Sequence, residues 1–369
     1  YARNVIIDKI NKSETKKENS VIIVKGGPGT GKTVIALHIL AEFAGHKEKK
    51  YRIFFSSRSK PLIEAIKYKM ERGQKVGEVN AKILFTSLDP YAPTRVNENE
   101  LDILIVDEAH RIGETSDHRF TKKEHRTNMP QVEQLIRCAK TSIFFIDDKQ
   151  AIRGAEVGNT KLIKDTAERL RRDVQEVELT SQFRCNGSDN YLDWLEYVLG
   201  HSNKKAILKK EDNFDFQIID SAETLYEIIK EKNSLKGMSA RIVAGYCWNW
   251  STKLNEKGEL ARDVKIGNFE LPWETHGDIN PPEGYVKWYE WAYKPEGIKQ
   301  VGCIYTAQGF EFDYIGVIVG SDLKYDKDND CLIANREGTK DPMLKRSKEK
   351  FDEYVKNIYR VLMSRGMKG

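Results

Sequence analysis

The chain has 369 residues, of which 39% are hydrophobic and 32% are charged, a composition typical of folded globular proteins. This length is enough for two domains that each bury a core. No apolar run approaches the ~18 residues of a membrane span, so the sequence predicts no membrane-spanning segment. The net charge of +5 permits contact with nucleic acid without requiring it.

The first half alternates short apolar runs with helical or polar segments. Runs that are apolar on both faces are typical of central strands in a parallel sheet that helices cover on both sides. The predicted strands are residues 21–24, 53–55, 83–85, 103–106, 143–146 and 174–179, and the predicted helices include residues 34–40, 62–70 and 132–138.

The second half repeats this alternation. Its predicted strands are residues 216–219, 242–244, 302–304 and 314–319, and its predicted helices include residues 191–199, 222–230 and 351–363. The sequence therefore predicts an α/β protein with two tandem domains, residues 1–178 and 179–369, each a mostly parallel sheet with helices on both faces.

Residues 246–300 differ from the rest of the second half. They are rich in tryptophan, proline and glycine and lack clear periodicity. We interpret them as an insertion in the second domain that is ordered by aromatic packing, with stacking of nucleic-acid bases as the alternative.

Cysteines and local charge give weaker signals. The five cysteines are scattered without C-x-x-C spacing, which predicts buried free thiols in a reduced, cytoplasmic compartment rather than a zinc site or disulfides. Basic runs within residues 119–126 and 161–172 are interpreted as solvated faces, with phosphate contact as the alternative. Residues 326–337 approach a calcium loop, but Cys331 stands where glycine is needed, so we predict a charged hairpin.

The most specific motif follows the first predicted strand and precedes a predicted helix. It fits G-x-x-x-x-G-K-[ST], whose glycines let backbone N–H groups point at a phosphate chain. The start of the helix adds unpaired N–H groups and a positive dipole end. We expect Lys32 to reach the β- and γ-phosphates of a nucleoside triphosphate and Thr33 to hold Mg²⁺. The loop residues are Gly26, Gly27, Pro28, Gly29, Thr30, Gly31, Lys32 and Thr33.

Acidic residues follow two other predicted strands. Asp107 and Glu108 come after residues 103–106, and carboxylates placed there are costly without a partner such as Mg²⁺ on the triphosphate. We expect Asp107 to hold the metal and Glu108 to orient and deprotonate the attacking water. A helix cap is the alternative for this pair. Gln150, after residues 143–146, is expected to sense the γ-phosphate, with a surface amide as the alternative.

The second half supplies cations for phosphoryl transfer. Arg184 lies just after the predicted domain boundary, and Arg365 lies at the end of the last predicted helix. Either residue alone would be an ordinary salt-bridging arginine. Together with the motifs of the first half they suggest arginine fingers supplied from the second domain.

The ordered series of motifs resembles a superfamily 1 helicase over essentially the whole chain. It is most similar to the bacterial Schlafen-like (Schlafen group 3-like) DNA/RNA helicase domains. The series is GGPGTGKT (26–33), RIFFSSRSK (52–60), IVDEAH (105–110), FIDDKQ (145–150), LTSQFRC (179–185), YTAQGFEFDYIGVIVG (305–320) and NIYRVLMSRGMKG (357–369).

This resemblance implies two RecA-like domains with ATP between them and a single nucleic-acid strand across their top. It assigns Gln308, Gly309 and Glu311 to a motif that couples the nucleotide to the strand and touches the ribose. The positions that it implies for contact with the nucleic-acid backbone are Ser56, Ser57, Arg58, Thr86 and Thr306.

The chain departs from the family pattern in one respect, because the glutamine that reads adenine upstream of the first motif has no clear counterpart. We interpret the chain as part of a longer protein with further domains. The resemblance implies a nucleic-acid-dependent ATPase that uses ATP and Mg²⁺ to translocate on or remodel single-stranded DNA or RNA. The alternative is a nucleotide-gated switch that controls an attached effector domain and binds nucleic acid or a partner without unwinding.

Overall fold

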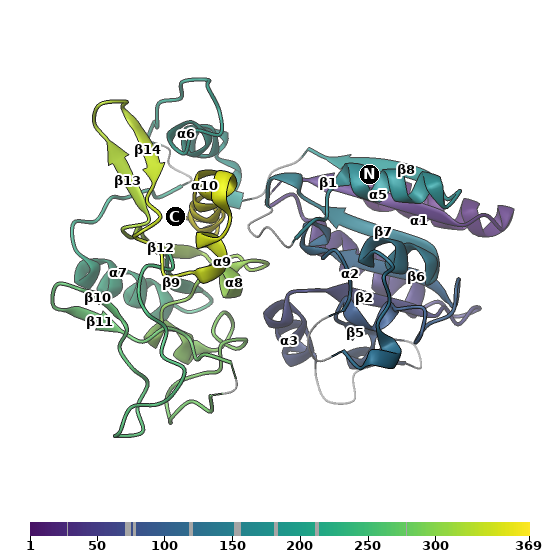
Figure 1. Ribbon diagram of the computed structural model, residues 1–369, viewed down its shortest axis with the longest axis horizontal. Coiled ribbons are helices and arrows are strands. Elements are labelled where there is room, and N and C mark those ends of the chain that lie inside the picture. Colours follow the sequence, from purple (N-terminus) through teal and green to yellow (C-terminus); the bar gives the residue numbers. More distant parts are fainter. Residues whose placement is uncertain are drawn as a thin grey trace. The chain divides into compact units, whose positions relative to one another are not determined.

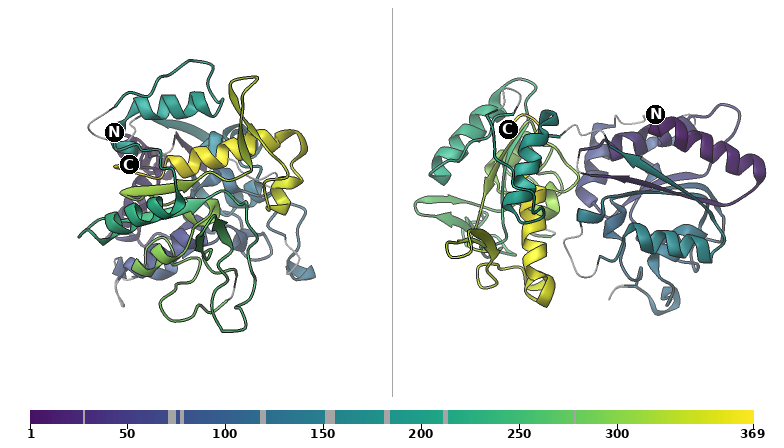
Figure 2. Two further views of the ribbon diagram at one scale, coloured as in Figure 1. Left: turned by 90° about the vertical axis from the view of Figure 1, so that its left-hand side faces the viewer. Right: turned by 90° about the horizontal axis from the view of Figure 1, so that it is seen from above.

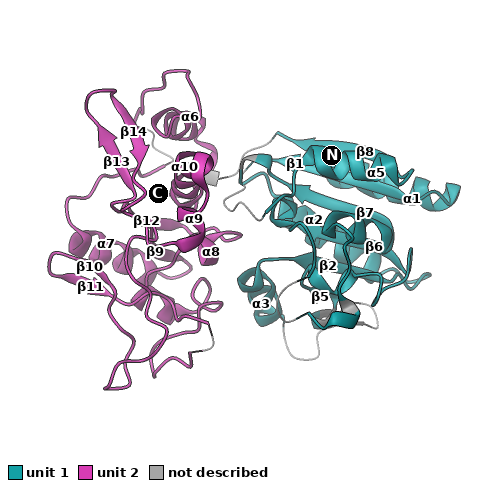
Figure 3. Ribbon diagram, viewed as in Figure 1, with its two compact units in different colours: residues 1–182 teal, residues 183–369 magenta. Residues whose placement is uncertain are grey.

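The chain is described by a computed structural model that covers residues 1–27, 29–70, 75–76, 79–117, 121–150, 156–180, 184–210, 214–277 and 279–369 (Figure 1). It divides into two compact units, residues 1–182 and 183–369 (Figure 3). Within the described ranges, no helix combines the length and apolarity that a membrane span requires.

Unit 1 is built on a six-stranded sheet in the order β5-β2-β6-β7-β1-β8, and all of its strand pairs are parallel. The strands of this sheet are β1 (Ser20–Gly26), β2 (Ile53–Ser57), β5 (Phe85–Thr86), β6 (Leu101–Asp107), β7 (Ala139–Ile146) and β8 (Asp173–Leu179). The helices are α1 (Ala2–Lys16), α2 (Lys32–Ala44), α3 (Lys60–Lys69), α4 (Gln131–Arg137) and α5 (Thr160–Arg169). Shorter elements are β3 (Lys75–Val76), β4 (Val79–Asn80), η1 (Ala81–Leu84), η2 (Asp89–Tyr91), η3 (Ala109–Arg111), η4 (Lys123–His125) and η5 (Asp148–Gln150).

Helices cover both faces of this sheet, as Figures 1 and 2 show. Successive side chains of a strand point to opposite faces, so the apolar residues of β1 divide between two cores. Ile22 and Val24 pack in the core that includes Ile6 of α1 and Ile39 of α2. Val21 and Ile23 pack in the second core, which contains residues of α4 and α5.

Unit 2 has a smaller parallel core in which β12 (Tyr314–Ile318) pairs with β9 (Ala240–Ala244). Isolated parallel bridges extend it on both sides, from Val243 to Gly302 and from Trp273 to Val301 on one side, and from Phe312 to Gly366 on the other. Its helices are α6 (Asp189–Val198), α7 (Ala222–Ser234), α8 (Ile304–Ala307), α9 (Pro342–Lys345) and α10 (Phe351–Met363). Its other elements are β10 (Val264–Ile266), β11 (Phe269–Leu271), β13 (Leu323–Asp326), β14 (Cys331–Ala334), η6 (Arg184–Gly187), η7 (Pro295–Lys299) and η8 (Lys348–Lys350).

The predicted α/β class with parallel sheets is confirmed, and so is the charged hairpin, which is β13–β14. Four of the five cysteines are buried free thiols, and Cys331 is exposed. Two predicted strands are wrong, and a third, residues 83–85, lies mostly in η1, with only Phe85 in β5. Residues 216–219 form no strand, and residues 302–304 give one bridge at Gly302 before α8 begins.

The aromatic segment, residues 246–300, is ordered partly by aromatic packing, as predicted, but its buried residues Val264, Phe269 and Trp273 join the core of unit 2 together with Ile242 of β9 and Ile229 of α7. Trp273 and Trp291 are fully buried, and Trp248 and Trp250 pack beside Trp273. Because both buried indoles are enclosed by protein, these two rings have no face for a nucleic-acid base.

Candidate nucleotide site and nucleic-acid interface

The predicted site residues of unit 1 lie along one edge of its sheet. All pairings are parallel, so the carboxyl ends of the strands share this edge, where ligands bind in open α/β sheets. Following the strand order, the edge presents Thr86 of β5, Ser56 and Ser57 of β2, Asp107 of β6, the loop with Gln150 after β7, and the phosphate loop after β1.

The phosphate loop is held by left-handed glycines and by its own lysine. Gly29 and Gly31 have φ angles of 74° and 79°, a backbone conformation that residues other than glycine rarely adopt. Gly31 directly precedes α2. The Lys32 Nζ donates hydrogen bonds to the carbonyl oxygens of Gly26 and Gly27, each at 2.7 Å. The lysine therefore lies over the loop that is predicted to hold phosphate. Pro28 lies outside the described residues.

Thr33 and Asp107 meet at the carboxyl edge of the sheet. The Thr33 hydroxyl donates to Asp107 Oδ2 at 2.7 Å, although 74 residues separate them. Asp107 Oδ1 is buried and has no hydrogen-bond partner among the described residues. Burial and then the neighbouring charge of Glu108 raise the pKa of Asp107 to about 7, against the lowering effect of Thr33. A hydroxyl beside an unpaired, buried carboxylate oxygen is a donor set that suits Mg²⁺.

Glu108 has an unusual backbone conformation and a histidine partner. Its φ of 54° is uncommon for a residue other than glycine, and such strained positions gather at functional sites. His110 Nε2 lies 3.1 Å from Glu108 Oε2, and both side chains are buried. Burial lowers the pKa of His110, which favours a neutral ring that can donate one hydrogen bond to the carboxylate. No role was predicted for His110, although it ends the IVDEAH motif, because the predicted chemistry used only the two carboxyl groups of that motif.

Gln150 lies in η5, directly after β7. Its amide Nε2 donates to Asp147 Oδ2 at 2.8 Å, and its Oε1 has no hydrogen-bond partner in the described part of the chain. The side chain is 2% exposed, so the alternative of a surface amide does not describe it.

The predicted nucleic-acid residues of unit 1 form a hydroxyl cluster next to an arginine. The Ser56 hydroxyl lies 2.7 Å from Thr86 Oγ1 and 2.5 Å from the Tyr91 hydroxyl. Ser56 is fully buried, as is Ser57, whose Oγ accepts from the Ser59 N–H.

Arg58 is the more accessible member of this predicted set, with 32% of its side chain exposed. Its guanidinium lies 3.4 Å from Gln131 Oε1 and 3.6 Å from Asp89. Buried Gln131 also accepts from the Gly113 N–H, so it fixes the loops around Arg58. Neither Tyr91 nor Gln131 stands in a motif, which is why sequence reasoning missed them.

In unit 2 the predicted coupling residues and the last arginine come together. We call residues 303–311, which include α8, the coupling loop. Arg365 donates to the carbonyl oxygens of Phe310 (3.2 Å) and Val361 (3.1 Å). Gln308 is buried, Gly309 has a φ of 91° and Glu311 is exposed.

Among the other predicted residues of unit 2, Thr306 is enclosed by protein. Thr306 is 1% exposed, and its hydroxyl donates to Glu274 Oε1 at 2.8 Å. Its predicted contact with nucleic acid stays a prediction, and the enclosed hydroxyl is engaged with protein. Arg184 begins η6, and its side chain lies outside the described part of the structure.

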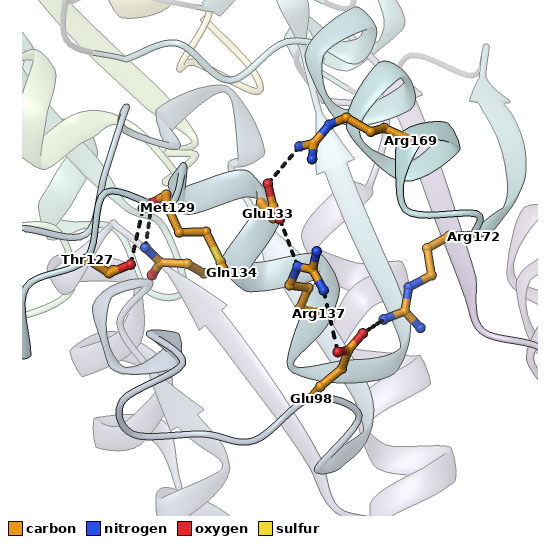
Figure 4. Close-up of polar contacts among 8 residues, drawn as sticks. All are labelled: Glu98, Thr127, Met129, Glu133, Gln134, Arg137, Arg169 and Arg172. Carbon is orange, nitrogen blue, oxygen red and sulfur yellow. Dashed lines mark hydrogen bonds and ion pairs between the residues drawn. The ribbon is translucent and has the colours of Figure 1, made fainter.

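The opposite edge of the unit 1 sheet carries the basic residues 169–172 in a paired network (Figure 4). Glu133 binds Arg137 and Arg169, both at 2.7 Å, while Glu98 bridges Arg137 and Arg172 at 3.4 and 3.3 Å. These residues lie just before β6, β7 and β8. The pairing favours a structural role over phosphate contact for Arg169 and Arg172.

The family model of the Schlafen group 3 DNA/RNA helicase domain matches residues 19–369. An uncharacterized protein of Saccharomyces cerevisiae, YPL245W, is 27% identical over 396 residues, which cover 96% of this chain and 81% of that protein.

Solved structures of Pif1 helicases resemble the chain more distantly. One of two coordinating Pif1 helicases at forked dsDNA has a TM-score of 0.35 at 11% identity, covering 86% of this chain and 84% of that one. Bacteroides Pif1 bound to ssDNA has a TM-score of 0.29 at 12% identity, covering 84% of each chain. The match of the family model over nearly the full length, with every motif in order, shows that the chain belongs to the Schlafen group 3 DNA/RNA helicase domain family.

Proposed function

We propose that this chain is a nucleic-acid-dependent ATPase of the superfamily 1 helicase type, which hydrolyses ATP to translocate on or remodel DNA or RNA. The contact between Thr33 and Asp107 carries the proposal. It joins the end of the phosphate loop to a buried carboxylate whose Oδ1 has no partner among the described residues. Membership in a helicase-domain family supports the same function.

The phosphate loop binds the triphosphate of ATP in this proposal. The backbone N–H groups at the start of α2 and the Lys32 ammonium face the phosphates, after the lysine leaves the carbonyl oxygens of Gly26 and Gly27. Thr33 and Asp107 would hold Mg²⁺, which neutralises charge on the phosphate oxygens when bound. A bound cation also stabilises the ionised form of Asp107, whose pKa burial otherwise raises.

Glu108 is the proposed general base. Its carboxylate would accept the proton of the attacking water, and His110 Nε2 lies 3.1 Å from its Oε2. Gln150, anchored by Asp147, would turn its amide to the γ-phosphate. Glu108 and Gln150 follow the neighbouring strands β6 and β7, which places their loops side by side at the carboxyl ends of the strands.

Arg184 and Arg365 of unit 2 would stabilise the negative charge that develops on the γ-phosphate during hydrolysis. Because Arg365 is bonded to the Phe310 carbonyl, its approach to ATP is coupled to the loop that contains Gln308 and Gly309. Ser56, Ser57, Arg58, Thr86 and Thr306 would follow the nucleic-acid backbone, with Arg58 supplying the direct phosphate contact. Closure and opening around ATP would then change the grip on the strand.

ATP hydrolysis by the full chain, with and without single-stranded DNA or RNA, tests this function. We expect either polymer or both to raise kcat at least about tenfold, with an effect that weakens as salt rises. No stimulation at any salt concentration would contradict the proposal. A strand-displacement assay then separates the two modes of action, because stimulated hydrolysis without displacement or stepping would favour a nucleotide-gated switch.

A further inference from the structure

The aromatic segment is organised around three consecutive residues, Trp273, Glu274 and Thr275. Trp273 Nε1 donates to the Asn249 carbonyl at 3.0 Å, and the Trp250 indole donates to the Glu274 carbonyl at 2.9 Å. The Trp288 N–H donates to Thr275 Oγ1 at 2.9 Å. Two separate stretches of the segment, around residues 249–250 and around Trp288, therefore converge on this tripeptide.

The same tripeptide is fixed to the sheet of unit 2. The Glu274 N–H donates to the Val301 carbonyl at 3.0 Å, and the Val301 N–H donates to the Pro272 carbonyl at 2.9 Å. Gly302, next along the chain, exchanges backbone hydrogen bonds with β9. A rigid path thus runs from β9 through residues 301–302 to Glu274.

Glu274 turns its carboxylate toward the start of α8. Oε1 accepts from the Thr306 hydroxyl at 2.8 Å and from the Cys303 N–H at 3.2 Å. α8 has only four residues and begins right after its N-cap, Cys303, so these two bonds hold the N-cap N–H and the third residue of the helix. The hydroxyl of Tyr305 donates to Asp341 on another side, and Arg365 holds the Phe310 carbonyl.

A packing role alone would not call for a carboxyl group here. Glu274 is 0% exposed, no basic side chain forms an ion pair with it in the described ranges, and its Oε2 has no hydrogen-bond partner there. Burial raises the pKa of Glu274 to about 7, although hydrogen bonds from Cys303 and Thr306 act in the opposite direction. An apolar side chain of similar volume would avoid this desolvation cost. The group is therefore placed for what it holds.

We propose that Glu274 is a positioning residue through which the aromatic segment sets the geometry of the coupling loop. Acting through Thr306, it keeps Gln308 and Gly309 where binding of nucleic acid can alter ATP hydrolysis. This inference rests on the proposed function and extends it, because it gives the aromatic segment a part in coupling. It also explains why Thr306, although buried, stands in a motif that the family resemblance connects with nucleic acid.

The test compares four proteins: the unsubstituted chain, Glu274→Leu, Glu274→Gln and Thr275→Val. The readouts are kcat and KM for ATP with and without saturating poly(dT) or poly(U), together with thermal unfolding. Glutamine keeps the acceptor that Thr306 and Cys303 use, whereas leucine keeps only the volume. Thr275→Val removes a part-buried hydrogen bond of the same segment without touching α8, so it is the matched structural control.

We expect Glu274→Leu to lower the ratio of stimulated to unstimulated kcat by about tenfold, while KM for ATP stays within about twofold. Glu274→Gln should restore most of that ratio. Thr275→Val should lower the melting temperature without changing the ratio. Thr306→Val should reproduce the leucine phenotype and add little to it in the double variant, because both changes break one contact.

Two results would overturn the inference. One is an unchanged ratio in Glu274→Leu. The other is an equal loss of ratio in Thr275→Val and Glu274→Leu, which would reduce Glu274 to a stabilising role. If the unsubstituted chain shows no stimulation by either polymer, the proposed function itself fails and this inference fails with it.

Discussion

Buried carboxylates have different surroundings at the two edges of the unit 1 sheet, the amino edge and the carboxyl edge, which are named for the ends of the strands that they contain. At the amino edge, Glu133 is buried, which raises its pKa, but bonds from Arg169 and Arg137 outweigh burial and the pKa is lowered. At the carboxyl edge, Asp107 Oδ1 has no partner among the described residues, and its pKa is raised to about 7. The arginine-paired carboxylate of Glu133 fits a structural role, whereas the unpaired Oδ1 of Asp107 fits the proposed metal site. We therefore interpret the amino edge as structural and the carboxyl edge as the proposed site of chemistry.

The largest expected effect is on chemistry at the carboxyl edge. Glu108→Gln should lower kcat for ATP hydrolysis by about 10³-fold, because it removes the proposed base while keeping the size of the side chain. The affinity for ATP should change little, as measured by equilibrium titration. An unchanged kcat would contradict the proposal that Glu108 is the general base and that hydrolysis takes place at the carboxyl edge.

The next largest expected effect is on the pH dependence of stability, because two buried carboxyl groups lack a basic partner among the described residues. Asp107 and Glu274 both have a pKa of about 7 when folded, above the ordinary values of 3.8 and 4.5. The folded state therefore binds more protons between about pH 4 and 7, and the free energy of unfolding should fall as pH rises through that window.

Asp107→Asn and Glu274→Gln should each flatten part of this dependence in metal-free protein. Their effects should add, because the two residues belong to different units. Denaturant unfolding at several pH values measures both. A pH profile that neither substitution alters would contradict the raised pKa values.

Two arginines, each beside a carboxylate, offer a matched comparison for nucleic-acid binding. Arg58→Ala, at the carboxyl edge, should weaken binding of single strands about tenfold and reduce the salt slope by about one phosphate contact. Arg169→Ala, at the amino edge, should change neither. Fluorescence titrations at several salt concentrations measure both variants, and equal losses would erase the distinction between the edges.

The smallest expected effect is on stability at the amino edge. Glu133→Ala leaves Arg169 without its partner and Arg137 with Glu98 alone. A loss of about 1 kcal/mol should lower the melting temperature by about 2–4 °C while kcat stays unchanged. A marked fall in kcat at unchanged stability would show that the amino edge takes part in catalysis, which would contradict its structural role.

The sequence predicted best where a local pattern and a structural constraint coincide. Residues 21–24 and 103–106 are apolar on both faces because helices cover both sides of the sheet, and the loop at 26–33 needs glycines for its left-handed turns. α1 was missed because it buries only Ile6, Ile10 and Ser13, a stripe too narrow to stand out.

Tertiary contacts decided the rest. Residues 216–219 form a short, mostly apolar run typical of a strand but pair with no strand among the described residues, and residues 302–304 divide between a bridge and α8. His110, Tyr91 and Glu274 act through partners that lie on other elements or, for His110, across a strained turn. No spacing in the sequence reveals such contacts.

The most direct test of the account is the turnover of Arg365→Ala, since the chemical edge of unit 1 is proposed to need a cation from unit 2. Single-turnover hydrolysis of ATP should slow by about 10³-fold while the affinity for ATP stays nearly intact. Two controls address the loss of the hydrogen bond to the Phe310 carbonyl. One is Arg365→Lys, which retains a donor near that carbonyl, and the other is thermal unfolding of each variant. Equal losses of ATP binding and turnover, or unchanged turnover in a folded variant, would contradict the account.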